Sequence, residues 1–376
     1  MDTRLISALA IVAALTACLT VVLVAIKLTH RGVQRWRGVR SAHYVAAVGE
    51  IVSRRMIPSN PPVAWTSDPQ FHDAVIDYKL LLSGDDRRFV DGLVDRLEIA
   101  DHLITRAKRR FPASSRLRAV SSLVSLAEGR HLEDLRALLA DRNPHVRVNT
   151  VRALARLGDA ESVPTVLDLA TRAEPWEAAR MADSLVEMGQ PAVAPLRAWV
   201  EQEANRPGGS VEVVALAARL LGLIGDPDAE PTLICLLASS QVDWRVAAAS
   251  ALEHAGSDSA IEPLRRALAD DEWQVRARAA TALSAMAHPG VASEVAQLLT
   301  DENWWVRQNS ASALDSIPGG QAMLIAALDG PDRFAADAAL NQLTMSGAFG
   351  EATERLRNGA GTEADRSLLA KATKAQ

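Results

Sequence analysis

Histidine and cysteine are the residues most often used to bind metals or to catalyse reactions, and in this chain they are scattered. The two cysteines, Cys18 and Cys235, lie far apart and lack metal-ligand spacing. The eight histidines do not cluster, and an adjacent pair such as Asp101-His102 points in two directions on a helix. No phosphate-binding loop, G-x-S-x-G or H-E-x-x-H motif is present. We therefore predict no enzymatic activity, no cofactor and no metal.

Tryptophan is the residue type whose placement suggests a function. The chain has 8 Trp, yet Trp304 and Trp305 are adjacent in the stretch DENWWVRQNS, and Trp273 occupies the place of Trp304 in the earlier stretch DEWQVRARAA. Consecutive helical residues point about 100° apart, so the doublet cannot pack against one neighbour. Because an exposed Trp is a common interface anchor, we predict partner binding at Trp305, Trp304, Trp273 and Trp244. Packing at a helix start is the competing interpretation, and their periodic placement favours it for Trp273 and Trp304.

The tryptophans recur because the chain itself repeats. Units start at positions 146, 177, 213, 244, 275 and 306, so the period is constant except for one longer interval between 177 and 213. Apolar residues at positions 0, +4, +7, +8 and +11 of a unit form one helix face, as Val275, Ala279 and Leu283 illustrate. A second helix follows in each unit. One such hairpin cannot bury its apolar face alone, so neighbouring hairpins must stack.

The predicted fold is an all-α solenoid of about seven or eight stacked hairpins of about 31 residues, with an N-terminal transmembrane helix. Hydrophobic residues make up 48% of the chain but aromatics only 4%, which favours helices over strands. The predicted solenoid covers residues 114–347. A helical cap region at 67–113 precedes it, and a C-terminal capping helix and tail at 348–376 follow it.

The repeats resemble HEAT repeats, specifically the short type found in phycobilisome lyases. The resemblance rests on Asp-x(4)-Val-Arg patterns followed by a leucine, as in Asp270, Val275, Arg276 and Leu283, and it covers roughly residues 115–347. It implies a ladder of Asp and Arg contacts between repeats, formed by Asp141, Arg147, Arg245, Asp270, Arg276, Asp301 and Arg307. Arg245 has no matching Asp in its own repeat.

The N-terminal segment has the properties of a membrane anchor. Residues 5–26 contain no charge, and as a helix they are about 33 Å long, which matches a hydrocarbon core of about 30 Å. Five basic residues follow between positions 27 and 40. The positive-inside rule then places the N-terminus outside and the solenoid in the cytoplasm. We predict a signal anchor at 1–29, followed at 30–66 by a basic juxtamembrane stem and a proline-rich linker.

A bacterial lipoprotein is the alternative to an uncleaved anchor. Residues 15–18 (Leu-Thr-Ala-Cys) resemble the site at which such proteins are cleaved and lipidated on cysteine, here Cys18. The residues after Cys18 stay apolar, whereas a mature lipoprotein normally begins with a polar tether. The anchor is therefore the favoured interpretation.

The distribution of charge argues against nucleic acid as a partner. Residues 56–376 contain 33 basic and 44 acidic residues, so this part has a net charge of 33 − 44 = −11, and the net positive charge lies in residues 1–55. A nucleic-acid-binding domain ordinarily carries a basic surface on its folded part. We therefore expect no nucleic-acid binding.

A solenoid offers an extended surface to other proteins. The predicted function is a membrane-anchored, non-enzymatic scaffold or adaptor for a membrane-associated protein. The NWWVR stretch and GPDRFAADAAL at 330–340 also resemble segments of bacterial membrane-anchored HEAT proteins, and this resemblance implies a membrane glycosyltransferase system as partner. The alternatives are a ligand or peptide sensor that uses a groove near Trp244, Trp273 and Trp304, and a lyase-like enzyme.

Overall fold

The computed structural model describes residues 40–58, 61–62, 65, 67–108, 112–206 and 210–375. Every regular element in these ranges is a helix, which confirms the all-α class. The predicted membrane span, residues 5–26, lies outside the described residues. Within the described ranges, no helix combines the length and apolar character needed to cross a bilayer.

The chain divides into two compact units, Met1–Ala153 (unit 1) and Leu154–Gln376 (unit 2), and the division falls inside helix α8 (Pro144–Arg156). Unit 1 begins, in its described part, with a helix over residues 40–54. The helices that follow are α3 (Pro69–Leu81), α4 (Gly84–Arg96), α5 (Ile99–Lys108), α6 (Ala113–Leu126), the 3-10 turn η1 (Gly129–His131) and α7 (Leu132–Leu138).

The helix over residues 40–54 belongs to the packed part of unit 1, although its sequence lies in the predicted stem. Tyr44 is buried, and its ring meets that of Phe71 edge-on at 5.6 Å. The Tyr44 hydroxyl donates to Asp68 Oδ2 at 2.8 Å, at the start of α3. The ring of Trp65 stacks on the ring of Phe71 at 5.1 Å. These contacts join part of the predicted stem and linker to α3.

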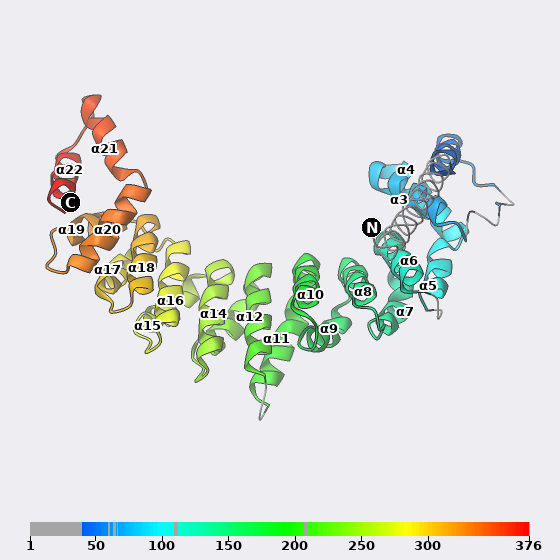
Figure 1. Cartoon of the computed structure of the whole chain (residues 1–376), viewed down its shortest axis with the longest axis horizontal. Helices are drawn as coiled ribbons and strands as arrows, with labels where there is room; N and C mark the ends of the chain where they lie inside the picture. Colours follow the sequence, from blue (N-terminus) through cyan, green and yellow to red (C-terminus); the bar gives the residue numbers. More distant parts are fainter. Residues whose placement is uncertain are drawn as a thin grey trace, which may run out of the picture. The chain divides into compact units, whose positions relative to one another are not determined.

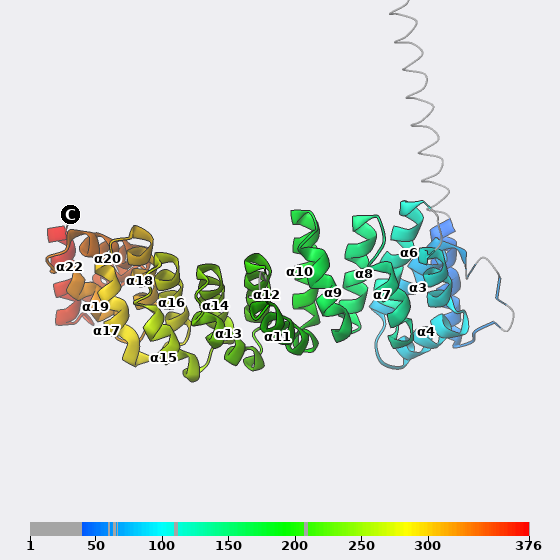
Figure 2. The same cartoon turned by 90° about the horizontal axis from the view of Figure 1, so that it is seen from below.

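Unit 2 consists of two rows of helices, which Figure 1 and Figure 2 show from two directions. The even-numbered row contains α10 (Pro175–Met188), α12 (Val211–Ile224), α14 (Val242–Ala255), α16 (Trp273–Ala285), α18 (Trp304–Ser316) and α20 (Arg333–Met345). The odd-numbered row contains α9 (Val163–Ala170), α11 (Gln190–Ala204), α13 (Glu230–Leu237), α15 (Asp258–Ala267), α17 (Ala292–Gln297) and α19 (Gly320–Ala327). The 3-10 turns of unit 2 are η2 (Ala160–Ser162), η3 (Pro227–Ala229), η4 (Pro289–Val291) and η5 (Leu298–Thr300).

The predicted apolar face forms the core between the rows. In α16, the side chains of Val275, Ala279 and Leu283 are fully buried. The leucine at position +8 is buried in all six sequence repeats that contain it: Leu154, Leu185, Leu221, Leu252, Leu283 and Leu314. A helix of mostly Ala, Val and Leu residues thus obtains its stability from the helices stacked beside it.

Helices α12 and α14 make the closest contact of the even-numbered row. A Cβ atom at Gly222 would lie 2.4 Å from the Cα of Ala251, so the two backbones approach through residues with almost no side chain. The indole Nε1 of Trp244, on α14, donates to the carbonyl oxygen of Val211 at the start of α12 at 3.0 Å. This hydrogen bond fixes the start of α12 against α14.

Two helices follow the repeats at the C-terminal end of unit 2, where the sequence predicted one capping helix and a tail. They are α21 (Ala348–Arg357) and α22 (Glu363–Ala375). Arg355 of α21 donates to the Asp365 carboxylate of α22 at 2.7 Å, which ties the two together. The Lys371 ammonium lies 2.8 Å from Asp329, so α22 also contacts the turn before α20.

Candidate partner-binding surface

The even-numbered helices of unit 2 are joined by arginines that bind two turns at once. The Arg276 guanidinium donates from Nε and Nη2 to the Asp301 carboxylate of the next repeat, at 2.7 and 2.9 Å. Its Nη1 donates to the carbonyl oxygens of Asp270 and Asp271 in the turn before its own helix. Arg276 therefore fixes the turn before α16 beside the turn before α18.

The same pairing occurs at two other repeats. Arg245 donates from Nε and Nη2 to Asp270, both at 2.8 Å, although its own repeat has no matching Asp. In unit 1, Arg116 makes the equivalent pair with Asp141. The sequence reasoning overlooked Arg116 and the direction of the pairing, which runs from each Arg to the Asp 25 positions later. That fixed separation was the signal that could have revealed both.

The ladder shifts the pKa of its carboxyl groups. Burial alone raises the pKa of Asp270 and Asp301, but the hydrogen bonds from Arg245 and Arg276 and from backbone N–H groups outweigh it. The net result is a pKa below the usual value for both groups. The Asp270 and Asp301 carboxylates are therefore ionised, and their ion pairs with Arg245 and Arg276 hold neighbouring repeats together.

Arg307 departs from this pattern. Its Nη1 donates to the carbonyl oxygens of Asp301 and Glu302, as in the other ladder arginines. Within the described residues, however, it pairs with no carboxylate, and its guanidinium instead lies over the ring of Phe334 at 5.0 Å from the centroid. Arg147 also donates to the carbonyl oxygen of Asp141 in the turn before its own helix.

The tryptophan doublet lies on the surface at the start of α18. Trp304 and Trp305 are 54% and 55% exposed, and their rings meet edge-on at 4.8 Å. Asn303 caps the helix by accepting a hydrogen bond from the Trp305 backbone N–H at 2.9 Å. Both indoles of the doublet therefore reach the surface, and partner binding there stays a prediction.

Phe334 extends this surface to the next repeat. It is 63% exposed, and Asp332 caps α20 by accepting from the Phe334 N–H, just as Asn303 does for Trp305. We name Trp304, Trp305 and Phe334 the aromatic surface. The sequence reasoning overlooked Phe334, because adding one repeat period to the position of Trp305 does not lead to it. Both residues follow an Asx cap, and this shared cap could have identified Phe334.

The two other predicted tryptophans are placed differently. Trp244 is only 9% exposed, and its Nε1 is already bonded to the Val211 carbonyl. Trp273 is partly exposed at the first position of α16. Trp244 therefore offers little contact area to a partner, and the three most exposed of the described large rings lie on α18 and α20.

Trp244 lines a pocket between α11, α13 and α14. The pocket has a volume of about 460 Å³, and its polar walls include Arg197 and Thr232, which are joined by a hydrogen bond of 3.2 Å. Val214 and Ser239 occupy the positions that hold Arg and Asp in the ladder, so this junction has no ion pair of that kind. The pocket lies where the ladder is interrupted.

The aromatic surface consists of apolar ring faces that a partner could contact. It offers three exposed rings, and the Arg307 guanidinium lies over one of them. Among the described residues, no group of three or more His, Cys, Asp or Glu side chains is arranged to hold a metal ion.

The stacked hairpins and their Arg–Asp ladder define an α-solenoid of repeated helical pairs. Four overlapping stretches match HEAT repeats, at residues 100–186, 133–207, 196–284 and 266–344. The chain belongs to the HEAT-repeat family. No curated protein sequence matches it.

Several solved structures are similar at low identity. A chain from the complex of CpcE and CpcF of phycocyanin lyase from Nostoc is 24% identical, with 41% of this chain and 99% of that chain covered and a TM-score of 0.37. Importin beta is 11% identical over 83% of this chain and 53% of its own, with a TM-score of 0.46. Kap121p is 14% identical over 76% and 38%, with a TM-score of 0.45. These identities carry no activity or partner over to this chain.

Proposed function

We propose that this protein is a non-enzymatic scaffold, held at the cell membrane by residues 5–26, that binds a protein partner through the aromatic surface. The observation that carries the proposal is the exposure of Trp304, Trp305 and Phe334, each more than half open to solvent. Large rings kept in water at neighbouring repeats cost free energy that a partner would recover by covering them. Tryptophan is also among the residues most enriched at binding hot spots.

The membrane location is supported by the sequence. A charge-free segment of bilayer-spanning length, residues 5–26, with a basic flank on its C-terminal side is typical of a signal anchor whose following domain lies in the cytoplasm. A partner that is itself membrane-bound would then be held close to the solenoid. The resemblance to membrane-anchored HEAT proteins points to a membrane glycosyltransferase as that partner.

Crosslinking in intact cells tests the proposal. The wild-type chain and Trp305→Ala are crosslinked and the captured proteins identified by mass spectrometry. We expect one membrane protein to be captured by the wild type and reduced at least tenfold in Trp305→Ala. Trp176→Ala is the matched control, because Trp176 is also exposed, at 43%, and lies in the first turn of α10 in the same row. Equal capture by all three chains would contradict a role for the aromatic surface.

The pocket at Trp244 favours a second candidate function, that of a sensor for a small ligand or peptide. A volume of about 460 Å³ is within the range of small-molecule sites, and Arg197 and Thr232 supply polar contacts. A panel of metabolites is screened for a rise in melting temperature. Cys235 also lines the pocket, so Cys235→Trp should fill it and abolish any such rise. A panel without any shift in the wild type would count against the sensor.

A further inference from the structure

The turns that precede α16 and α18 place carboxylates beside the aromatic surface. Residues 270–272 read Asp-Asp-Glu and residues 301–303 read Asp-Glu-Asn, without a basic residue in either turn. Asp270 and Asp301 are used by the ladder. Asp271 and Glu302 are exposed and Glu272 is half-buried, and these three form no ion pair among the described residues.

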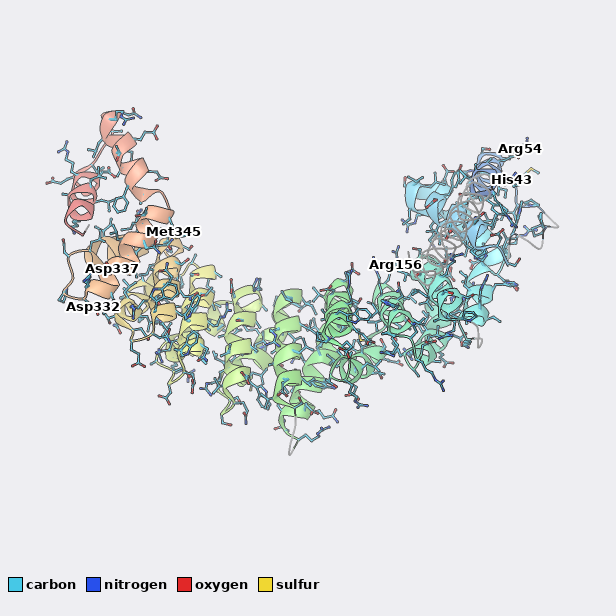
Figure 3. All side chains as sticks on the ribbon, in the orientation of Figure 1. His43, Arg54, Arg156, Asp332, Asp337 and Met345 are labelled. Atoms are coloured by element: carbon cyan, nitrogen blue, oxygen red, sulfur yellow. The ribbon has the colours of Figure 1, made fainter. Side chains whose placement is uncertain are left out.

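These carboxylates and rings form one continuous surface because two arginines hold their turns together. Arg276 bonds to the carbonyl oxygens of the first turn and to the carboxylate of the second. Arg307 bonds to the carbonyl oxygens of the second turn and covers one face of the Phe334 ring. The two turns and the start of α20 are therefore neighbours. Figure 3 shows Asp332 at the start of α20, Asp337 along it and Met345 at its far end.

The unpaired carboxylates are not consumed by helix capping. Glu272 occupies the N-cap position of α16 but makes no side-chain cap hydrogen bond. Asn303, and not Glu302, caps α18. Glu302 attracts Arg276, and Asp271 and Glu272 attract Arg245, but none of the three carboxylates is within ion-pair distance of these arginines, so each can still pair with an incoming group. Ion pairs at such a rim mainly set which partner binds and how fast.

One ring of this surface already binds a cation. The Arg307 guanidinium over Phe334 is a cation–π contact, and Phe334 nevertheless remains 63% exposed. Tryptophan faces bind cations more strongly than phenylalanine faces do. The exposed indoles of Trp304 and Trp305, with Glu302 in the turn that precedes them, therefore offer the same chemistry to a cation from outside the chain.

We propose that the aromatic surface and the turns 270–272 and 301–303 bind a segment rich in arginine and lysine on the partner protein. Cytoplasmic loops of membrane proteins carry an excess of such residues. A basic loop of a membrane-bound partner would stack its guanidinium groups on the rings and pair with Asp271, Glu272 and Glu302. This inference rests on the proposed scaffold function for the identity of the partner.

Peptide binding to the full chain in non-ionic detergent tests the inference. The probe is a fluorescein-labelled peptide made of six Arg-Ser dipeptides, and its counterpart has glutamate in place of arginine. We expect the basic peptide to bind at least tenfold more tightly by fluorescence anisotropy. Trp305→Ala and the double variant Asp271→Asn/Glu302→Gln should each weaken binding at least fivefold. The double variant should also flatten its dependence on salt.

Two variants serve as matched controls in unit 2. Trp176→Ala removes an exposed indole from another repeat, and Asp168→Asn removes an exposed carboxylate from α9. Both should bind the basic peptide like the wild type, and melting curves of all variants show that each is folded. Similar losses in the controls and in the surface variants would overturn the inference.

Three other results would overturn it while leaving the scaffold proposal standing. They are equal binding of the two peptides, Trp305-dependent binding of zwitterionic lipid vesicles in place of the basic peptide, and Trp305-dependent self-association of the chain. In each case the crosslinking comparison of wild type with Trp305→Ala still decides independently whether a protein partner uses this surface.

Discussion

At the scale of single residues, the arginine–aspartate ladder dominates the contacts between repeats. The Arg276 and Asp301 side chains are 11% and 7% exposed, and two short hydrogen bonds join them. We expect Asp301→Ala to lower the free energy of unfolding by about 2 kcal/mol, because it leaves a mostly buried guanidinium without its partner. Chemical denaturation of the two chains measures the difference.

The control for that experiment is Asp337→Ala. Asp337 lies 3.9 Å from Arg333, and both side chains are largely exposed, so this pair should contribute less than about 0.5 kcal/mol. Equal effects of Asp301→Ala and Asp337→Ala would mean that the ladder is no stronger than an ordinary surface ion pair.

The ladder also predicts how stability depends on pH. The pKa values of Asp270 and Asp301 are lowered in the folded chain, so their contribution is complete above the unfolded value of about 3.9. It is lost as the pH falls through the folded pKa values. We expect melting temperatures to drop steeply below about pH 4. Asp270→Asn should flatten this drop, and an unchanged profile in that variant would contradict the assignment.

Much of this residue-scale detail was beyond sequence reasoning. The pattern identified Arg276, Asp301 and their equivalents, because a repeated charge at a fixed position is visible in an alignment of units. It did not show that Arg245 finds its carboxylate in the next repeat, since the partner of a long side chain depends on how the units stack. The exposure of Trp304 likewise depends on the neighbouring helices.

At the scale of elements, the distance between α12 and α14 depends on the small size of Gly222. Gly222→Ala would place a Cβ 2.4 Å from the Cα of Ala251 and 3.0 Å from its carbonyl oxygen. We expect a loss of about 1–3 kcal/mol, because backbone atoms must move apart and this outweighs the better helix propensity of alanine. Thermal unfolding of the variant measures the loss.

Gly350→Ala is the matched control for that change. Gly350 lies in α21 of the same unit, and an added Cβ would meet nothing within 4 Å. It should therefore be neutral or stabilise the chain by up to about 1 kcal/mol. A loss at Gly350 as large as that at Gly222 would show that close packing of α12 and α14 is not the cause.

The helix boundaries show where local sequence signals succeed and where they fail. Gly158, Gly189 and Gly225 follow the first helix of their repeats. All three have positive φ angles, the conformation that commonly ends a helix and that glycine adopts most readily. Gly256 occupies the same sequence position but has a φ of −85°. A Cβ there would crowd the carbonyl oxygen of Leu252 in the last turn of α14, so a close backbone contact, and not a positive φ angle, accounts for this glycine.

At the scale of the whole molecule, the anchor makes a prediction that separates it from a lipoprotein. The full chain should stay in the membrane fraction during carbonate extraction, and deletion of residues 1–26 should release it. The intact mass of the membrane form should include the residues before Cys18. A mature chain that begins at a lipidated Cys18 would contradict the anchor.

The repeat architecture was the most predictable property of the molecule. Six sequence repeats with a constant period, apart from one longer interval, favour stacked hairpins over other all-α folds. Each hairpin exposes an apolar face that only another hairpin covers. The packing of residues 40–54 against α3 was not predictable. It depends on Tyr44, Asp68 and Phe71 meeting in space, and nothing in their local sequence indicates that encounter.

The interruption of the ladder implies an order in which the array comes apart. Ion pairs of Asp270 and Asp301 help to hold α14 to α16 and α16 to α18, whereas α12 and α14 are held by Gly222 against Ala251 and by the indole bond of Trp244. Acid removes the first kind of contact and leaves the second almost intact. Below about pH 4, amide hydrogens of α16 and α18 should exchange first, and the α12–α14 pair should be the last structure to survive.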